Sequence, residues 1–226
     1  RTALVAGSLL LAACGPAERP STGGPALKTF RYSMDQAPTT LDPVQGSNIY
    51  ANFVIVNAYD TLYSYKYLAR PYELKPNLAV DFPTISPDGL VYTFRLKPGV
   101  HFIDDPAFPG GRGREVVAED LIYSIKRQFD PRNQPQGAWL WQGRIAGLEE
   151  WKAAGSDYDQ PVSGLRAIDS HTLEITLLRP YPQLVSTLAQ GYAALVAREA
   201  VEKYGKGLGV RPVGSGPFRL VSYDTA

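Results

Sequence analysis

Apolar residues between positions 86 and 102 recur at every second position, which is the period of a β-strand with one buried face. The alternation runs from Leu90 to Leu96, stops at the turn sequence KPG at 97–99, and resumes at Val100 and Phe102. The sequence PDG at 87–89 supplies another turn before it. The pattern predicts a β-hairpin over this stretch.

A helical pattern follows the hairpin. Apolar residues recur at helical spacing from Leu121 to Phe129, and the sequence DP at 130–131 ends the pattern. Val117 stands at the expected N-cap, although it has no side-chain oxygen to accept a backbone N–H. Glu119 and Asp120 suit the positive end of the helix dipole. We therefore predict an amphipathic helix whose first turn is weakly capped.

Weaker patterns predict the other elements. Two alternating runs, 165–168 and 172–178, flank the turn sequence DSH and indicate a second hairpin. Gly205 is typical of the end of a helix. Mixed helices and strands in this order predict an α/β fold with α+β character. The remaining expected elements are strands at 28–34 and 218–223, helices at 52–62, 182–188 and 198–204, and a partly helical stretch at 139–152.

Composition and charge exclude few classes of protein. Hydrophobic residues make up 44% of the chain and charged residues 20%, which is ordinary for a globular protein. A net charge of +1 gives no argument for a nucleic-acid partner. The densest basic pair, Arg112 and Arg114, lies in a glycine-rich loop and is expected to be solvated.

The N-terminal residues have the character of an export signal. Thr2 to Ala13 form an apolar run that is too short to span a bilayer. The run ends in LAAC, which resembles the processing motif of bacterial lipoproteins, with Cys14 as the acylated residue. Cys14 is the only cysteine, and a buried structural role is the alternative, although the Gly and Pro residues that follow do not continue a helix. The sequence predicts part of a lipoprotein signal peptide at 1–13 and a flexible tether at 14–26.

Residue types that carry catalysis are scarce. The two histidines, His101 and His171, have no partner at a spacing that suggests a catalytic pair or a metal site. No zinc-protease, nucleophile-elbow, P-loop or EF-hand motif occurs, and the glycines at 205–209 follow a predicted helix instead of a strand. The sequence therefore predicts neither an enzyme nor a bound metal or cofactor.

Aromatic residues are the abundant candidates for binding. The chain has 14 Tyr, 8 Phe and 3 Trp, and five of the tyrosines lie between Tyr59 and Tyr72. A tyrosine packs its ring and still hydrogen-bonds at its tip, which suits a bulky polar ligand or a domain interface. Most of these five are nevertheless expected to build a core.

Four blocks of sequence occur in the order found in a known family. They are LDP at 41–43, SPDGLVYTFRLKPGVHF and AEDLIYSIKR within 86–127, LRAIDSHTLEITL at 165–177, and PVGSGPFRL at 212–220. Together they closely resemble extracytoplasmic solute-binding protein family 5, the oligopeptide-, dipeptide- and nickel-binding lipoproteins of ABC importers. One departure is the stretch 104–116, which is longer and richer in Gly and Pro than is usual between the hairpin and the helix of this family.

The resemblance implies a periplasmic-binding-protein-like type II fold, with two lobes and an extra inserted domain. Residues 27–46 and 161–226 would belong to the ligand-floor lobe, and residues 47–160 would form the inserted domain. The chain would be the N-terminal part of a longer protein, with the second lobe beyond Ala226.

The resemblance also implies which residues touch a ligand. In oligopeptide-binding relatives the loop before LDP lies along the ligand and hydrogen-bonds its backbone, as an added strand does. The matching residues are Gln36, Ala37, Pro38 and Thr39. Pro38 has no N–H, so the donor pattern must differ from full strand pairing.

Two further segments match positions near the ligand. Trp139 and Trp141 occupy the neighbourhood in which relatives place an aromatic wall, and one of the two is open to a core role instead. Gly214, Ser215 and Gly216 resemble the stretch that leads to the crossing between the lobes. Their backbone would contact ligand or flex during closure, although a plain turn explains these glycines equally well.

The implied function is the capture of peptides, most of all oligopeptides, for an ABC permease. The expected location is the periplasm or the cell surface, with lipid on Cys14 anchoring a monomer to a bacterial membrane and no nucleic acid involved. A nickel chelate or an oligosaccharide is the alternative ligand. An envelope sensor or chaperone without transport is the alternative role.

Overall fold

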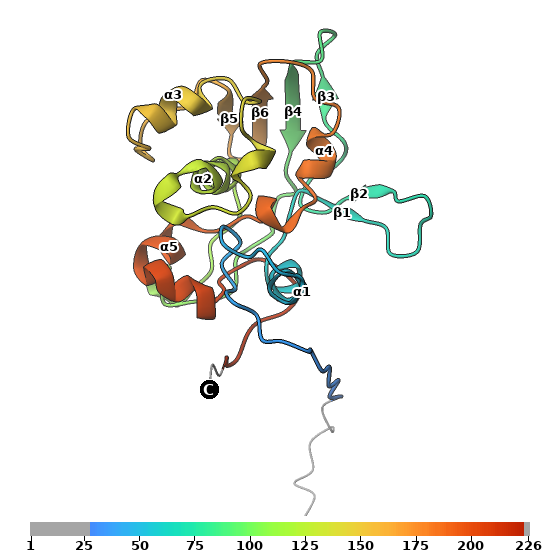
Figure 1. Cartoon of the computed structure of the whole chain (residues 1–226), viewed down its shortest axis with the longest axis vertical. Helices are drawn as coiled ribbons and strands as arrows, with labels where there is room; N and C mark the ends of the chain where they lie inside the picture. The colour runs from blue at the N-terminus through green and yellow to red at the C-terminus, as the bar shows by residue number, and fades with distance from the viewer. Residues whose placement is uncertain (1–27, 224–226) are drawn as a thin grey trace, which may run out of the picture. The chain divides into compact units, whose positions relative to one another are not determined.

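A computed structural model describes residues 28–223 and contains both helices and strands (Figure 1). The chain divides into two units, residues 1–33 and 34–226. Of the first unit only residues 28–33 are described, and they have no regular secondary structure. The predicted strand at 28–34 is therefore wrong, because these residues do not form a strand. The predicted signal peptide, the tether and Cys14 lie outside the described residues.

The helices and strands in the described part of the second unit have the following bounds. The α-helices are α1 (Ile49–Ala58), α2 (Ala118–Phe129), α3 (Leu148–Ala153), α4 (Leu184–Thr187) and α5 (Arg198–Tyr204). The 3-10 helices are η1 (Pro109–Gly111), η2 (Pro131–Asn133), η3 (Ala138–Leu140), η4 (Gly191–Ala193) and η5 (Gly205–Val210). The strands are β1 (Tyr63–Tyr65), β2 (Leu74–Pro76), β3 (Thr84–Ile85), β4 (Val91–Arg95), β5 (Leu165–Asp169) and β6 (Thr172–Thr176).

A four-stranded antiparallel sheet in the order β3-β4-β6-β5 organises the upper part of the second unit in Figure 1. β5 and β6 form the predicted second hairpin, with Arg166 opposite Glu174. β4 pairs along its whole length with β6, which places Phe94 opposite Leu173. Helices together with an antiparallel sheet agree with the predicted α/β fold of α+β character.

The strand predicted from Leu90 to Leu96 is confirmed as β4, but its predicted partner is wrong. β4 turns back onto β3 through a turn in which Gly89 has a φ of 72° and donates its N–H to the Ser86 carbonyl at 2.8 Å. His101 forms an isolated bridge with Glu115 instead of pairing with β4. Alternation shows which face of a strand is buried, but it does not identify the neighbouring strand.

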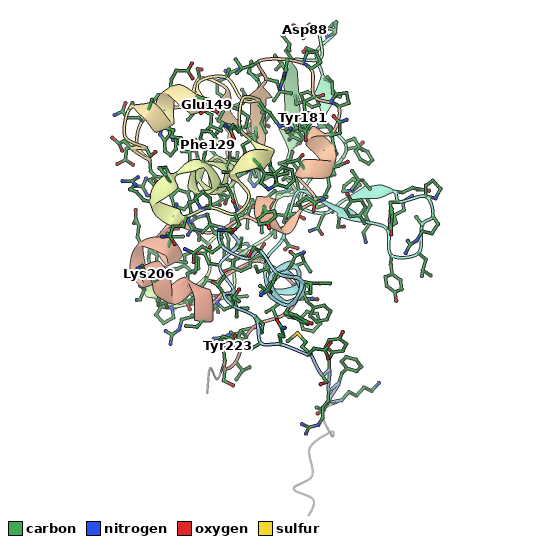
Figure 2. All side chains as sticks on the ribbon, in the orientation of Figure 1. Asp88, Phe129, Glu149, Tyr181, Lys206 and Tyr223 are labelled. Atoms are coloured by element: carbon green, nitrogen blue, oxygen red, sulfur yellow. The ribbon has the colours of Figure 1, made fainter. Side chains whose placement is uncertain are left out.

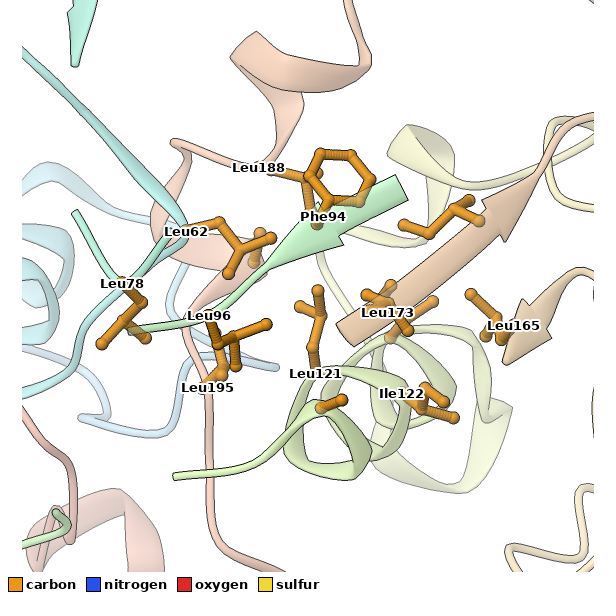
Figure 3. Close-up of a cluster of buried hydrophobic side chains, with 14 of the residues drawn as sticks. Leu62, Leu78, Phe94, Leu96, Leu121, Ile122, Leu165, Leu173, Leu188 and Leu195 are labelled. Atoms are coloured by element: carbon orange, nitrogen blue, oxygen red, sulfur yellow. The ribbon is translucent and has the colours of Figure 1, made fainter. Parts of the chain in front are cut away.

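Helix α2 packs against β5 and β6 and closes the main core. In Figure 3, Leu121 and Ile122 of α2 lie close to Leu173 of β6, and Phe94 of β4 lies in the same cluster. Leu121, Leu173 and Phe94 are each 0% exposed. Burial of side chains of this size stabilises a fold by about 1.5–3 kcal/mol each, so the predicted amphipathic helix is a main contributor to the core.

The first turn of α2 is held by Asp120 and not by the N-cap residue. Val117 makes no side-chain cap, whereas the Asp120 carboxylate accepts the Val117 N–H at 2.8 Å. Arg114 donates two further bonds to this carboxylate, at 2.8 and 2.7 Å. Burial raises the pKa of Asp120 above its ordinary value, and the bonds from Arg114 offset only part of this effect.

Replacing Val117 with Thr is expected to stabilise the protein by about 1 kcal/mol, because Thr has nearly the shape of Val and adds an oxygen for an unpaired N–H of the first turn. Urea unfolding monitored by circular dichroism measures the change. Val201→Thr, inside α5, is the matched control and should give no gain, since its hydroxyl finds no free backbone donor in a helix interior. A Val117→Thr variant no more stable than this control would contradict the capping argument.

The long loop 104–116 is ordered by its side chains. Asp105 is 9% exposed, and it accepts a hydrogen bond of 2.6 Å from the hydroxyl of Tyr204. Arg114 pairs with Glu199 of α5 at 2.6 Å in addition to its bonds to α2. The expectation that Arg114 is solvated is therefore wrong, because its two ion pairs join α2 to α5.

The last third of the chain confirms two predicted helices and corrects one predicted strand. The helix predicted at 182–188 is α4, although it is shorter than predicted. Arg198–Tyr204 is α5, and Gly205 follows it with a φ of 50°. Residues 218–223 have no regular secondary structure. The N–H of Phe218 instead donates to the Asn57 carbonyl at 3.1 Å, at the end of α1.

Helix α1, at Ile49–Ala58, begins and ends earlier than the predicted range 52–62. Apolar residues lie on all sides of this helix. The Asn48 side chain caps it by accepting the Ala51 N–H at 2.7 Å. Ala51 and Ile55 are buried on one side, whereas Ile49 is 76% exposed and Val56 49% exposed on the other. A helix that is apolar all round is usually buried all round, so this exposed side is unusual for a protein surface.

Within residues 28–223, no helix is long and apolar enough to cross a membrane.

Candidate functional site

The turn that contains LDP is joined to α2 by a buried ion pair. The Asp42 carboxylate accepts two hydrogen bonds from the Arg127 guanidinium, at 3.1 and 2.9 Å. The side chain of Arg127 is 5% exposed and that of Asp42 is 9% exposed. Beside them, the Gln128 side chain donates to the Pro43 carbonyl at 3.0 Å. Two of the four sequence blocks therefore meet at this point in space.

The Arg127 guanidinium of this ion pair keeps its positive charge. Burial alone would lower the pKa of Arg127, but the hydrogen bonds and the negative charge of Asp42 raise it above its ordinary value. Burial, helped by the charge of Asp42, also raises the pKa of the nearby Tyr59 hydroxyl far above its usual range. Neither Arg127 nor Tyr59 titrates near neutral pH, so these two groups hold the structure together and do not exchange protons.

The predicted ligand loop lies at the surface of the second unit. Gln36, Ala37 and Thr39 are exposed, whereas Pro38 is buried. The Pro38 carbonyl accepts a hydrogen bond of 2.5 Å from the hydroxyl of Tyr223. The three exposed residues are therefore the ones whose backbone a ligand can reach. Pro38 offers a ligand neither backbone group, because it has no N–H and its carbonyl is bonded to Tyr223.

Trp139 lines a pocket of about 280 Å³ together with residues of the segment 181–192. Its side chain is 62% exposed, so much of the indole faces solvent. The Arg144 guanidinium lies over the Tyr181 ring, 3.7 Å from its centroid, and holds this wall in place. Aromatic faces combined with amides and hydroxyls suit a ligand that has both apolar groups and peptide-like amides. The polar and aromatic lining includes Tyr181, Gln183, Thr187, Gln190 and Tyr192.

Trp141 is a core residue. It is 1% exposed and belongs to the main hydrophobic cluster, so it offers no surface to a ligand. The prediction that Trp141 forms part of a ligand wall is therefore wrong. The physical reason is the 3-10 turn η3, which places two tryptophans two positions apart on different sides of the backbone.

The predicted loop approaches the Trp139 pocket across the first turns of α1. The Asn48 side chain donates to the Thr39 hydroxyl at 3.3 Å. One turn further along α1, Asn52 lies so close to Gly191 that a Cβ there would be 2.2 Å from its Oδ1. Gly191 lies between Gln190 and Tyr192, which both line the pocket, so loop, helix and pocket form one continuous stretch of contacts.

Gly137 fixes the position of Trp139 from the other side. A Cβ on Gly137 would lie 2.7 Å from the Gln128 side chain and 2.8 Å from that of Tyr192. A larger residue would push η3 away from both. Because Gln128 also holds the Pro43 carbonyl, the pocket and the LDP turn are attached to the same end of α2.

Gly214, Ser215 and Gly216 pack against the end of α1. A Cβ on Gly214 would lie 2.1 Å from the Ala58 carbonyl oxygen, and one on Gly216 would lie 2.6 Å from the Ala58 carbonyl carbon. The Ser215 hydroxyl donates to Asp60 at 3.0 Å. Close approach of two backbones accounts for both glycines, and the role of this stretch in a hinge stays a prediction.

The described residues offer little to catalysis or metal binding. Among them, no group of three or more His, Cys, Asp or Glu side chains is arranged to hold a metal ion. His171 lies 3.1 Å from Glu115 near the surface, at the turn between β5 and β6 and away from the Trp139 pocket. The arrangement is suited to holding a ligand by contact and hydrogen bonding.

Comparison with known families decides the assignment. The sequence model of the bacterial extracellular solute-binding proteins, family 5 Middle, matches residues 73–226. The chain belongs to this family. Family 5 membership agrees with the resemblance of the four sequence blocks, and three of those blocks lie inside the matched range.

Known relatives in family 5 are longer than this chain. The glutathione-binding protein GsiB of Escherichia coli O1:K1 is 30% identical over 186 residues, which cover 82% of this chain and 30% of GsiB. GsiB of Shigella dysenteriae serotype 1 is 29% identical over the same shares of both proteins. The chain therefore spans about a third of the length of these relatives.

Solved structures of similar proteins agree with the predicted fold. An oligopeptide-binding protein, OppAIV of Borrelia burgdorferi, superimposes with a TM-score of 0.71 at 27% identity. DppA of Helicobacter pylori in complex with the peptide STSA gives a TM-score of 0.64 at 26% identity. Both cover 83% of this chain and 35% of the other chain. The fold is that of part of a periplasmic-binding-protein-like type II protein.

The sequence did not reveal several residues around the pocket. Tyr181, Gln190 and Tyr192 lie in a stretch with only weak helical periodicity, and no motif sets them apart. Arg127 is the last residue of the sequence block within 86–127, and nothing in the sequence predicted its ion pair with Asp42. Its partner is 85 positions away, so no local pattern connects the two residues.

Proposed function

We propose that this chain is the N-terminal part of a lipid-anchored substrate-binding protein that captures peptides outside the cytoplasmic membrane and delivers them to an ABC permease. The observation that carries the proposal is the exposed Trp139 beside a pocket with aromatic and amide walls, in a chain of family 5. GsiB is named for glutathione, which is itself a short peptide, and DppA was solved with the peptide STSA. Both names support a peptide ligand.

The proposed binding mode uses two surfaces. Trp139 would stack against an apolar or planar part of the peptide, and exposed amides of Gln183 and Gln190 are placed to hydrogen-bond its polar groups. The loop of Gln36, Ala37 and Thr39 would supply backbone hydrogen bonds along the ligand. Closure of a second lobe over these surfaces would exclude water and produce the form that a permease recognises. No covalent step is involved.

We also propose a revised division of the chain. The inserted domain would run from residue 47 to about Leu178, and the floor lobe would comprise 27–46 with the residues after Leu178. The main support is the four-stranded sheet, because β5 and β6 pair with β4 across the predicted boundary between residues 160 and 161. A domain boundary is more favourable where few contacts cross it.

Replacing Trp139 with Ala in the full-length protein is expected to weaken peptide binding by about 10- to 100-fold, the usual loss for a central aromatic contact. Stability should hardly change, because the side chain is 62% exposed. Isothermal titration calorimetry measures affinity, and thermal unfolding measures stability. Leu178→Ala is the matched control, since Leu178 is 59% exposed and does not line the pocket. Normal binding by the Trp139 variant would remove Trp139 from the site.

Native mass spectrometry of the full-length, unlipidated protein tests the ligand class. A ladder of co-purified short peptides is the expected result. A single non-peptide mass would overturn the peptide proposal in favour of a nickel chelate or an oligosaccharide. Uptake of labelled peptide by cells that lack the gene separates transport from a sensor or chaperone role. Loss of the gene should lower peptide uptake if the protein serves transport, and should leave uptake unchanged if it is a sensor or a chaperone.

A further inference from the structure

The hairpin β1–β2 carries exposed aromatic and basic side chains that do not line the Trp139 pocket. Its two strands pair antiparallel, and the loop between them, residues 66–73, projects away from the other elements of the second unit (Figure 1). Tyr67 is 89% exposed, Leu68 80% and Tyr72 71%. In Figure 2 the side chains of this loop stand out with no other element beside them. We call residues 65–73 the tyrosine loop.

The tyrosine loop is organised by its own side chains. The rings of Tyr65 and Tyr72 meet edge to face with centroids 6.1 Å apart, and the Arg70 guanidinium lies 4.5 Å above the Tyr72 ring. Lys66 and Glu73 form an ion pair of 2.6 Å at the base. These contacts hold Tyr67 and Leu68 outward at the apex, so little ordering is needed when the loop meets a partner.

The charge of the tyrosine loop favours an anionic partner. Glu73 is its only carboxylate, and Lys66 neutralises it. Arg70 has no carboxylate partner among the described residues, so the loop carries one uncompensated positive charge. Tyrosine and leucine at an apex, with Arg and Lys just behind them, match the layers of a bilayer interface, where amphipathic rings sit at headgroup depth and cations meet phosphate.

Other classes of partner fit this loop less well. A stable protein interface buries about 800 Å² on each partner and 20–30 residues a side, which exceeds a projecting loop of this size. Recognition of a sugar needs free amides or carboxylates for its hydroxyls, and the one carboxylate here is engaged. A lipid surface requires neither a large complementary face nor a directed hydrogen-bond set.

We propose that the tyrosine loop is a membrane-contact element, which places Tyr67 and Leu68 in the interface of an anionic bilayer with Arg70 among the phosphates. It rests on the proposed function in one respect, since lipid on Cys14 would keep the loop within reach of the membrane. The contact is weak and reversible, because only two apolar side chains insert. Its effect is to orient a body that the proposed lipid anchor alone would leave free to turn.

Vesicle co-sedimentation tests the proposal with the full-length protein made without its signal peptide and carrying Cys14→Ser, so that no acyl chain contributes. Binding to phosphatidylglycerol vesicles and weaker binding to phosphatidylcholine vesicles are expected. Arg70→Gln should lower binding to the anionic vesicles about fivefold, and Tyr67→Ser with Leu68→Ser should abolish measurable binding. The control pair Ile168→Ser and Leu178→Ser removes two exposed apolar side chains elsewhere and should leave binding unchanged.

Three results would overturn the proposal. One is equal binding by the tyrosine-loop variant and the control pair, and another is no binding of the parent protein to anionic vesicles. A photo-crosslinker in place of Tyr67 that captures a protein in cells instead of lipid would also contradict it. Peptide affinity of the parent protein and of the tyrosine-loop variant is measured in parallel. A parent protein that binds vesicles but no peptide would count against the proposed function and leave the membrane contact standing. Loss of peptide binding only in the tyrosine-loop variant would assign the loop to the peptide site and count against the membrane contact.

Discussion

Replacing Arg127 with Met is expected to destabilise the protein by about 3–5 kcal/mol, which is the usual cost of breaking a buried ion pair by removing one partner. Met retains most of the volume of the side chain, so the loss comes from leaving the Asp42 carboxylate buried without its two charged hydrogen bonds. Urea unfolding followed by circular dichroism measures the change. It should be one of the largest single effects in the described residues.

Two further variants separate charge from packing in this prediction. Combining Arg127→Met with Asp42→Leu should recover much of the loss, because no unpaired charge remains. Recovery will be incomplete, since the Asp42 side chain also accepts the Val44 N–H at 3.1 Å. Arg166→Met breaks an exposed pair with Glu174 and should cost less than about 1 kcal/mol. If Arg127→Met costs no more than Arg166→Met, the buried pair does not hold the LDP turn.

Replacing Trp141 with Ala is expected to cost about 3–5 kcal/mol through the cavity that it leaves in the core. The side chain is 1% exposed, and its ring N–H has no hydrogen-bond partner in the described part of the chain, so packing is the interaction that is lost. Trp141→Phe keeps an aromatic ring and should cost clearly less. Thermal and urea unfolding both measure these differences.

The neighbouring Trp139→Ala variant is the internal comparison for this second prediction. The two tryptophans are two positions apart, yet one substitution should lower stability and the other should lower affinity. Equal stability of the two variants would contradict the assignment of Trp141 to the core. If Trp141→Phe lowers peptide affinity and leaves stability unchanged, Trp141 contacts the ligand after all.

Local sequence patterns predicted the elements that depend on nearby residues. Helix α2, the β5–β6 hairpin and α5 with Gly205 are each specified by their own periodicity and end signals, and each was found near its predicted place. The partner of β4 was predicted wrongly because its alternation fits any neighbour with a matching apolar face. The actual partner, β6, lies on the order of 80 residues away in sequence.

Strand pairing also explains the two strands that were predicted and are not formed. Residues 28–34 and 218–223 have β-like composition, but a strand exists only through hydrogen bonds to a neighbour. The candidate site shows the same limit. Trp139 and Trp141 look alike in sequence, and only the three-dimensional arrangement around η3 distinguishes an exposed ring from a buried one.

The strand order β3-β4-β6-β5 has a consequence for how the protein folds. It consists of two local hairpins, which can form within microseconds, joined by one pairing between distant segments. At a synthesis rate of about 5–20 residues per second, β4 would wait roughly 4–17 s for β6 to be made. During that interval the edge of β4 that later pairs with β6 is open to other chains, and so are the side chains of Tyr92 and Phe94 that the finished core buries. Slow synthesis or export should therefore make newly made protein prone to aggregation, even though the finished sheet is well covered.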